Sequence, residues 1–95
     1  MPTGTDEERQ WVFKPHALFE MARRQISEDV VRSVLSAPQQ SVRARAGRMV
    51  FQSKIAAGDP PTTYLLRVFV DVDRSPAEVV TAYRTSKIEK YWRLS

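Results

Sequence analysis

The only histidine of the chain, His16, stands directly after Pro15. Proline suits the first turn of a helix, so the sequence predicts that His16 lies at a helix start. The positive end of the helix dipole disfavours an imidazolium there and leaves a neutral imidazole that can take a proton near pH 7. His16 is therefore a candidate general base or acid. The alternative is a surface histidine that only hydrogen-bonds near the helix start.

Other side chains, in the second half of the chain, could act on a phosphate group. Arg67, Arg84 and Lys87 supply cations. Tyr83 and Thr85 supply hydroxyl groups that could orient a phosphate. Cleavage of RNA needs no metal ion if a base takes the 2′-hydroxyl proton, an acid protonates the leaving oxygen and cations stabilise the phosphorane. Together with His16, these residue types fit a metal-independent ribonuclease.

Arg67, and the aromatic residues near the C-terminus, also have a purely structural interpretation. Arg67 could pair with Asp71 on the same face of a strand instead of binding a phosphate. Tyr91 and Trp92 are expected to pack a C-terminal helix onto a sheet rather than to stack on bases. The glycines are too scattered to form a phosphate-binding loop, and there is no paired-carboxylate motif.

Two helices are expected in the first half of the chain, after a polar, aperiodic tail over residues 1–10. Residues 11–13 are apolar and dock as a short extended segment. Apolar residues at helical spacing then predict a helix over 15–24. Ser27, followed by acidic residues, predicts the start of a second helix that ends at Pro38.

Strands are expected in the second half. Alternation on both sides of Gly47 predicts a hairpin over 42–55, and further strands follow over 62–72 and 78–85. A short helix over 86–92 begins at a Ser86 cap. The sequence therefore predicts an α+β fold in which two N-terminal helices pack on a four-stranded antiparallel sheet with a short C-terminal helix. Residues 11–95 form a single domain.

Helices on one side of an antiparallel sheet leave its other face free. If Leu66, Val68 and Val70 face the helices, the opposite face of that strand carries Arg67, Phe69 and Asp71. Neighbouring strands add polar and aromatic residues to this face by the period of two: Arg43, Arg45, Gln52, Lys54, Thr81, Tyr83 and Thr85. A basic surface with interleaved aromatic rings is typical of proteins that hold single-stranded or loop RNA. Arg43, Arg45, Lys54 and Lys87 are the predicted RNA-binding cations.

Composition excludes several classes of chemistry. The chain has 95 residues and no Cys, so disulfides, thiol nucleophiles and Cys-metal sites are excluded. One His and no carboxylates at ligand spacing argue against a metal ion, and no cofactor is expected. No apolar run is long enough to span a membrane, and the segment MPTGTDEERQ is not a signal peptide. We therefore expect a cytoplasmic protein.

Charge points to a polyanionic partner. There are 15 Lys and Arg against 11 Asp and Glu, a formal net charge of +4. No acidic residue lies between Asp29 and Asp59, an interval with several arginines, and the last residues are again basic. Basic charge concentrated in two segments suits RNA. The alternative is that these cations only protect strand edges from aggregation.

Four segments in order resemble a known family: HALFEMARRQISEDVVRSVLSAP, GRMVFQSKI, TTYLLRVFVDVD and VVTAYRTSKIEKYW. They resemble domain of unknown function family 4258, whose members look like relatives of the RelE/ParE and BrnT toxins. The resemblance implies a RelE-like fold and a ribonuclease-type toxin held inactive by an antitoxin protein. It also implies that the family keeps the positions of His16, Arg67, Tyr83, Arg84 and Thr85.

The chain departs from that pattern at Glu20, where relatives often carry an arginine, and at Gln25, where glycine is common. The first hypothesis is a metal-independent endoribonuclease that cleaves RNA through 2′-hydroxyl attack. The loss of a cation at position 20 suits the alternative, a non-catalytic module that binds RNA or a protein partner and keeps the fold and basic face.

Overall fold

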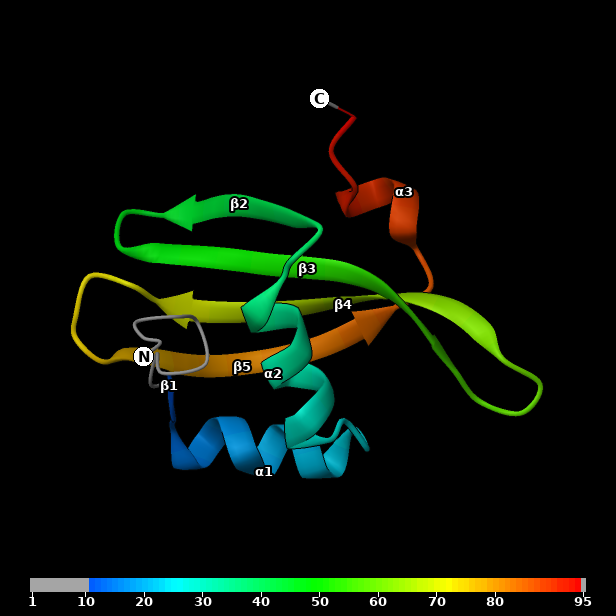
Figure 1. Cartoon of the computed structure of the whole chain (residues 1–95), viewed down its shortest axis with the longest axis horizontal. Helices are drawn as coiled ribbons and strands as arrows, with labels where there is room; N and C mark the ends of the chain where they lie inside the picture. Colours follow the sequence, from blue (N-terminus) through cyan, green and yellow to red (C-terminus); the bar gives the residue numbers. More distant parts are fainter. Residues whose placement is uncertain (1–10, 95) are drawn as a thin grey trace, which may run out of the picture.

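The protein is a five-stranded sheet with two helices packed against one of its faces (Figure 1). The computed structural model describes residues 11–94. Its elements are β1 (Trp11–Phe13), α1 (Pro15–Arg23), α2 (Glu28–Ser36), β2 (Gln40–Arg45), β3 (Arg48–Ala57), β4 (Thr62–Asp71), β5 (Ala77–Thr85) and α3 (Ile88–Tyr91). The strand order is β1-β5-β4-β3-β2. The predicted tail over 1–10 lies outside the described residues.

The predicted four-stranded antiparallel sheet is wrong, and a RelE-like fold is not shown. Strands β2 to β5 do form an antiparallel meander, but β1 adds a fifth strand that runs parallel to β5, with Trp11 opposite Ala77 and Phe13 opposite Val79. The Lys14 amide extends this edge by donating to the Val79 carbonyl over 3.1 Å. The fold is α+β with a mixed sheet. Three residues are too few to display a period of two, so the segment could be predicted as extended but not as paired.

The first two helices lie within two residues of their predicted bounds. Pro15 occupies the first helical position of α1, where no backbone donor is lost. Ser27 caps α2, because its hydroxyl oxygen accepts a 3.1 Å hydrogen bond from the Val30 amide. The Ser86 cap predicted for the C-terminal helix is wrong: α3 is only a single turn, and its N-cap residue is Lys87, without a side-chain cap.

The core lies between the helices and one face of the sheet. Leu66, Val68 and Val70 of β4 are fully buried there, which confirms the predicted face. Their partners come from both helices and from β5: Ala17, Met21, Ile26, Val31, Val34, Leu35, Val79 and Ala82. Alternation along β4 therefore directs Leu65, Arg67 and Phe69 to the opposite face. We call that opposite face the open face.

One ion pair stabilises the far end of β3 and β4. Arg48 donates to both carboxylate oxygens of Asp71, at 2.6 and 3.1 Å, and Asp71 is only 7% exposed. The hydrogen bonds from Arg48, its charge and that of Arg74 hold the pKa of Asp71 below its usual value. Asp71 is thus engaged by other arginines and does not pair with Arg67.

This pair predicts a pH dependence of stability. A carboxyl with a lowered pKa in the folded state contributes stability above its unfolded pKa of about 3.9, and this contribution is lost as the pH falls through the folded pKa. Asp71→Asn should therefore lower the free energy of unfolding at pH 7 by about 1–3 kcal/mol and flatten its decline below about pH 5. Urea unfolding from pH 3 to 7 measures both. The exposed Asp73→Asn is the control, and an equal effect from it would contradict the prediction.

Candidate functional site

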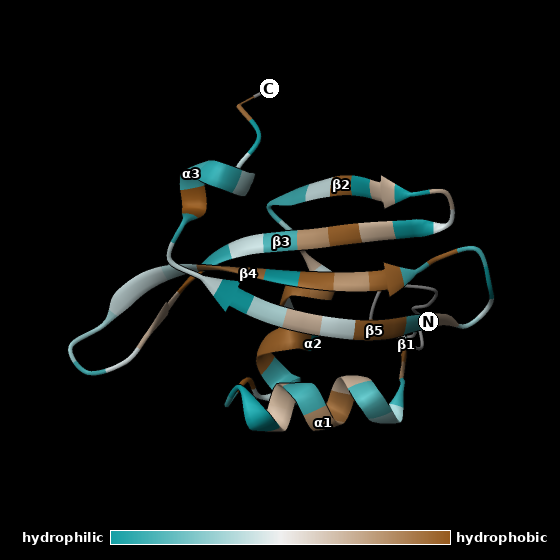
Figure 2. Cartoon of the chain, turned by 180° about the vertical axis from the view of Figure 1, so that it is seen from behind, coloured by the Kyte–Doolittle hydropathy of each residue, from teal (hydrophilic) through white to brown (hydrophobic). Residues whose placement is uncertain are grey.

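Arg67 lies on β4, the middle strand of the sheet (Figure 2), and alternation directs its side chain to the open face. Its side chain is nearly buried, at 9% exposure. Nε donates to the amide oxygen of Gln52 over 2.9 Å, and Nη1 donates to the Tyr83 hydroxyl over 2.8 Å. Gln52 on β3 and Tyr83 on β5 are its direct cross-strand neighbours. The sheet register therefore holds the guanidinium between two neutral acceptors.

The charge of Arg67 has no acidic partner in the part of the chain that the structure describes. None of the ion pairs among residues 11–94 involves it. Nη2 also has no acceptor there. Because no buried side-chain nitrogen or oxygen in that range lacks a partner, Nη2 must be the atom that solvent reaches. Buried charges are normally paired, so an unpaired one with a free donor is a candidate binding group.

Aromatic rings surround this guanidinium. Its central carbon lies 4.2 Å from the ring centroid of Tyr91, 5.4 Å from that of Phe69 and 5.9 Å from that of Tyr83. Phe69 and Tyr83 are stacked, and Tyr91 meets Tyr83 edge-on. Ring faces stabilise a cation without neutralising it. We call Arg67, Gln52, Phe69, Tyr83 and Tyr91 the Arg67 cluster.

The electrostatics of Tyr91 reflect the positive surroundings. A hydrogen bond with Tyr83 lowers the pKa of the Tyr91 phenol, and the charges of Lys90 and Arg67 lower it further. A phenol with a lowered pKa ionises more readily than free tyrosine, so a larger share of it is present as the phenolate at a given pH. The cluster therefore combines an accessible cation with a hydroxyl that could exchange a proton.

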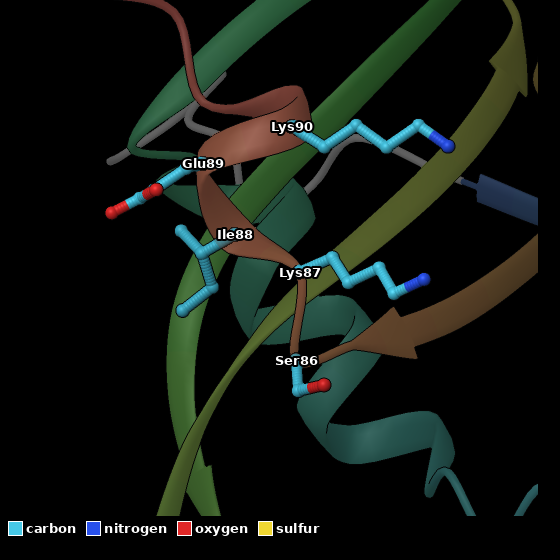
Figure 3. Close-up of a pocket in the computed structure, with 5 residues that line it drawn as sticks. All are labelled: Ser86, Lys87, Ile88, Glu89 and Lys90. Carbon is cyan, nitrogen blue, oxygen red and sulfur yellow. The ribbon is translucent and has the colours of Figure 1, made fainter.

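Lysines of the α3 segment extend the positive charge of the cluster. Residues Ser86 to Lys90 line an open surface pocket of about 460 Å³. Figure 3 shows the side chains of Lys87 and Lys90 extending to the same side, away from Glu89. Neither lysine has a carboxylate partner among the described residues. The α3 segment thus provides unpaired ammonium groups close to Tyr91.

The structure brings together some of the predicted site residues. Arg67 contacts Tyr83 directly, and Thr85 is on the same strand, two positions beyond Tyr83. The Thr85 hydroxyl accepts from the Lys87 amide over 3.0 Å, so it fixes the turn into α3. Lys54 lies on the open face, with its ammonium 4.1 Å from the Trp92 ring centroid.

Other predicted site residues lie elsewhere. His16 is on α1, which packs against β5; its side chain is 74% exposed and lies 3.9 Å from Glu20. Arg84 also lies on the helix side, opposite Leu66, and donates to the Gln25 carbonyl over 3.2 Å. Glu20 is four positions after His16, one helical turn away, so the acidic group beside His16 belongs to the same helix. Neither residue contacts the Arg67 cluster.

The predicted arginines of β2 are divided between the faces. Arg43 is opposite Met49, which is opposite Val70, so Arg43 lies on the helix side. A register shift between Arg43 and Arg45 then changes the alternation, and Arg45 acts on Asp71 through its charge. A bulge of this kind cannot be predicted from the alternation of side chains alone.

Sequence reasoning missed the roles of Gln52, Lys90 and Tyr91. Gln52 was placed on the open face, but nothing in the sequence indicates that it is fully buried and accepts from Arg67. Tyr91 packs the terminal helix onto the sheet, as expected, but nothing in the sequence indicates that its partners there are the Arg67 guanidinium and the Tyr83 ring. The signal in the sequence is YRTSKIEKYW, in which basic residues lie between aromatic ones at the end of β5 and through α3.

Fold and site together define a small α+β domain with a positively charged, aromatic site on an open sheet face. Residues 13–84 match the family model described as Domain of unknown function (DUF4258), and the chain belongs to this family. The match stops before α3, so the Lys90 and Tyr91 part of the site lies beyond it. No curated protein and no solved structure gives a significant match.

Neither a metal centre nor a membrane span is found in the described part of the chain. Among residues 11–94, no three or more His, Asp or Glu side chains lie close enough together to hold a metal ion. None of the described helices is long and apolar enough to cross a bilayer.

Proposed function

We propose that the protein is an RNA-binding module that holds a single-stranded segment against the open face of its sheet. The observation that carries this proposal is the accessible, unpaired Arg67 guanidinium among aromatic rings. A phosphate oxygen would accept from Nη2, and the charge that the protein leaves unpaired would be neutralised by the ligand.

Neighbouring side chains suit the rest of a nucleotide. Lys87 and Lys90 have no acidic partner among the described residues and can reach flanking phosphates. The exposed parts of the Phe69 and Tyr83 rings offer stacking surface to an unpaired base, which a duplex keeps inside its stack. Single strands are therefore preferred over duplexes.

Binding of a fluorescein-labelled 12-nucleotide single-stranded RNA, followed by anisotropy, tests this proposal. With about three phosphate contacts, the logarithm of the affinity should fall against the logarithm of the salt concentration with a slope of about −2. The matched duplex should bind more weakly. Absence of binding at low salt, or equal affinity for the duplex, would contradict the proposal.

A second candidate function is metal-independent cleavage of RNA at the same cluster. The resemblance to the RelE/ParE and BrnT toxins implies a ribonuclease. The lowered pKa of Tyr91 beside Arg67 and Lys90 favours it, because a base and cations then lie together. In this reaction Tyr91 takes the 2′-hydroxyl proton, the 2′-oxygen attacks phosphorus, and the bond to the 5′-oxygen breaks. The leaving 5′-oxygen takes a proton from water, a 2′,3′-cyclic phosphate remains, and Tyr91 passes its proton to the resulting hydroxide.

A further inference from the structure

The C-terminal segment crosses one end of the open face and is held there by the side chain of Gln40 on β2. The Gln40 amide nitrogen donates to the Arg93 carbonyl over 2.6 Å, and its amide oxygen accepts from the Arg93 backbone N–H over 3.1 Å. The single side chain thereby satisfies both backbone groups of Arg93, as a neighbouring strand would. Figure 2 shows α3 and the end of the chain at this end of the sheet.

The same glutamine is connected to Arg67 by hydrogen bonds. The Gln40 amide oxygen also accepts from Nε2 of Gln52 over 2.8 Å, and Gln52 Nε2 donates to the Tyr91 carbonyl over 3.2 Å. The amide oxygen of Gln52 accepts from Nε of Arg67. A continuous network therefore joins the Arg93 backbone to the guanidinium.

Tyr91 covers the cation to which this network leads. Its ring centroid lies 4.2 Å from the guanidinium carbon, and the side chain of Arg67 is left 9% exposed. Solvent reaches Nη2, but so little of Arg67 is exposed that a phosphate can contact the guanidinium only once Tyr91 has moved away. The Tyr91 ring stabilises the guanidinium while no anion is bound, and it thereby also restricts access to it.

The covering segment is weakly anchored apart from these contacts. Helix α3 is one turn long, has no side-chain N-cap and contributes no buried residue. Its further contacts with the sheet include the edge-on contact of Tyr91 with Tyr83 and the pair of the exposed Lys54 with the half-buried Trp92. Segments with few buried contacts open at low free-energy cost, so this segment can detach while the sheet stays folded.

We propose that residues 88–93 form a lid over Arg67, that Gln40 is its latch, and that lid opening regulates the binding of phosphate groups. This inference rests on the proposed function for its biological ligand, single-stranded RNA. If only the open form admits a phosphate, the measured dissociation constant equals that of the open form divided by the fraction of molecules that are open. Loss of the latch should then strengthen binding.

The test is Gln40→Ala, compared with Gln39→Ala. Gln39 is a glutamine at the preceding position that bonds the backbone of Lys54 and not the lid. Hydrogen exchange at the Arg93 amide should become at least about tenfold faster in Gln40→Ala. The affinity for inorganic phosphate, titrated by NMR at the Arg67 and Tyr83 signals, should rise at least about threefold. Gln39→Ala should match the wild type in both measurements.

The possible outcomes separate the lid from the proposed function. Unchanged exchange at Arg93 in Gln40→Ala would overturn the latch. Faster exchange with equal or weaker phosphate binding, or no phosphate response at Arg67 in any form, would overturn the lid. If the RNA proposal alone is wrong, the 12-nucleotide RNA binds neither the wild type nor Gln40→Ala. Hydrogen exchange at Arg93 and the affinity for phosphate still increase in Gln40→Ala.

Discussion

Replacement of Arg67 by methionine is expected to weaken binding of single-stranded RNA at least about tenfold. The substitution removes the one nearly buried cation of the open face, and a charge-assisted hydrogen bond to phosphate contributes about 1.5–3 kcal/mol. Methionine keeps an unbranched side chain of similar length between Tyr91 and the sheet. Anisotropy titration with the 12-nucleotide RNA measures the effect.

The matched control for this prediction is Arg84→Met. Arg84 is on the adjacent strand and carries the same charge, but its guanidinium donates to the Gln25 carbonyl on the helix side. Its substitution changes the net charge equally, so any common loss reports only long-range electrostatics. A loss in Arg84→Met as large as that in Arg67→Met would refute a specific role for Arg67.

Arg67→Met should weaken RNA binding without a matching loss in the free energy of unfolding. Removing a buried, unpaired charge relieves its desolvation cost, whereas Gln52 and Tyr83 each lose one hydrogen bond. These effects are of similar size and opposite sign, so the free energy of unfolding should stay within about 1 kcal/mol of wild type. If the removal of a nearly buried arginine leaves the free energy of unfolding unchanged, its role is binding rather than packing.

The main elements could be predicted because their signals are local. Pro15 and Ser27 mark helix starts, and alternation over β4 identifies both its faces. The fifth strand could not be predicted, because its pairing with β5 is a contact between residues far apart in sequence. Its three residues carry no periodic signal of their own.

Only those contacts of the site could be predicted that follow from the alternation of side chains along neighbouring strands. Arg67 and Tyr83 meet because alternation directs both to the open face. Arg84 follows Tyr83 immediately and therefore points to the other side, a consequence of the same period. Whether His16 reaches the site depends on how α1 packs on the sheet, and the partners of Arg67 depend on the burial of Gln52. Neither is encoded in local sequence.

The lid and the second candidate function place different demands on Tyr91. Phosphate entry requires its ring to leave Arg67, whereas proton transfer requires its hydroxyl to return beside Tyr83. A ribonuclease built this way would open to admit RNA and close for chemistry. Gln40→Ala would then bind RNA more tightly and cleave it more slowly, a combination that a simple loss of folding does not produce.

If the protein cleaves RNA, Tyr91→Phe should reduce the rate about 100-fold or more, and His16→Ala should leave it unchanged. Phenylalanine keeps the ring over Arg67 but removes the hydroxyl, and general acid–base groups contribute about 10²–10⁴-fold. His16 lies on α1, is exposed, and has no contact with the Arg67 cluster among the described residues. Cleavage of a labelled RNA in EDTA, with detection of the 2′,3′-cyclic phosphate, gives the rates.

The two variants separate the two mechanisms that the residues allow. Loss of cleavage in His16→Ala with normal cleavage in Tyr91→Phe would restore His16 as the base and remove Tyr91 from the chemistry. RNA binding by both variants at wild-type affinity is the required control, because Tyr91→Phe retains the ring over Arg67 and His16 does not touch the cluster. Binding without any cleavage by the wild type would exclude the ribonuclease and leave the RNA-binding module.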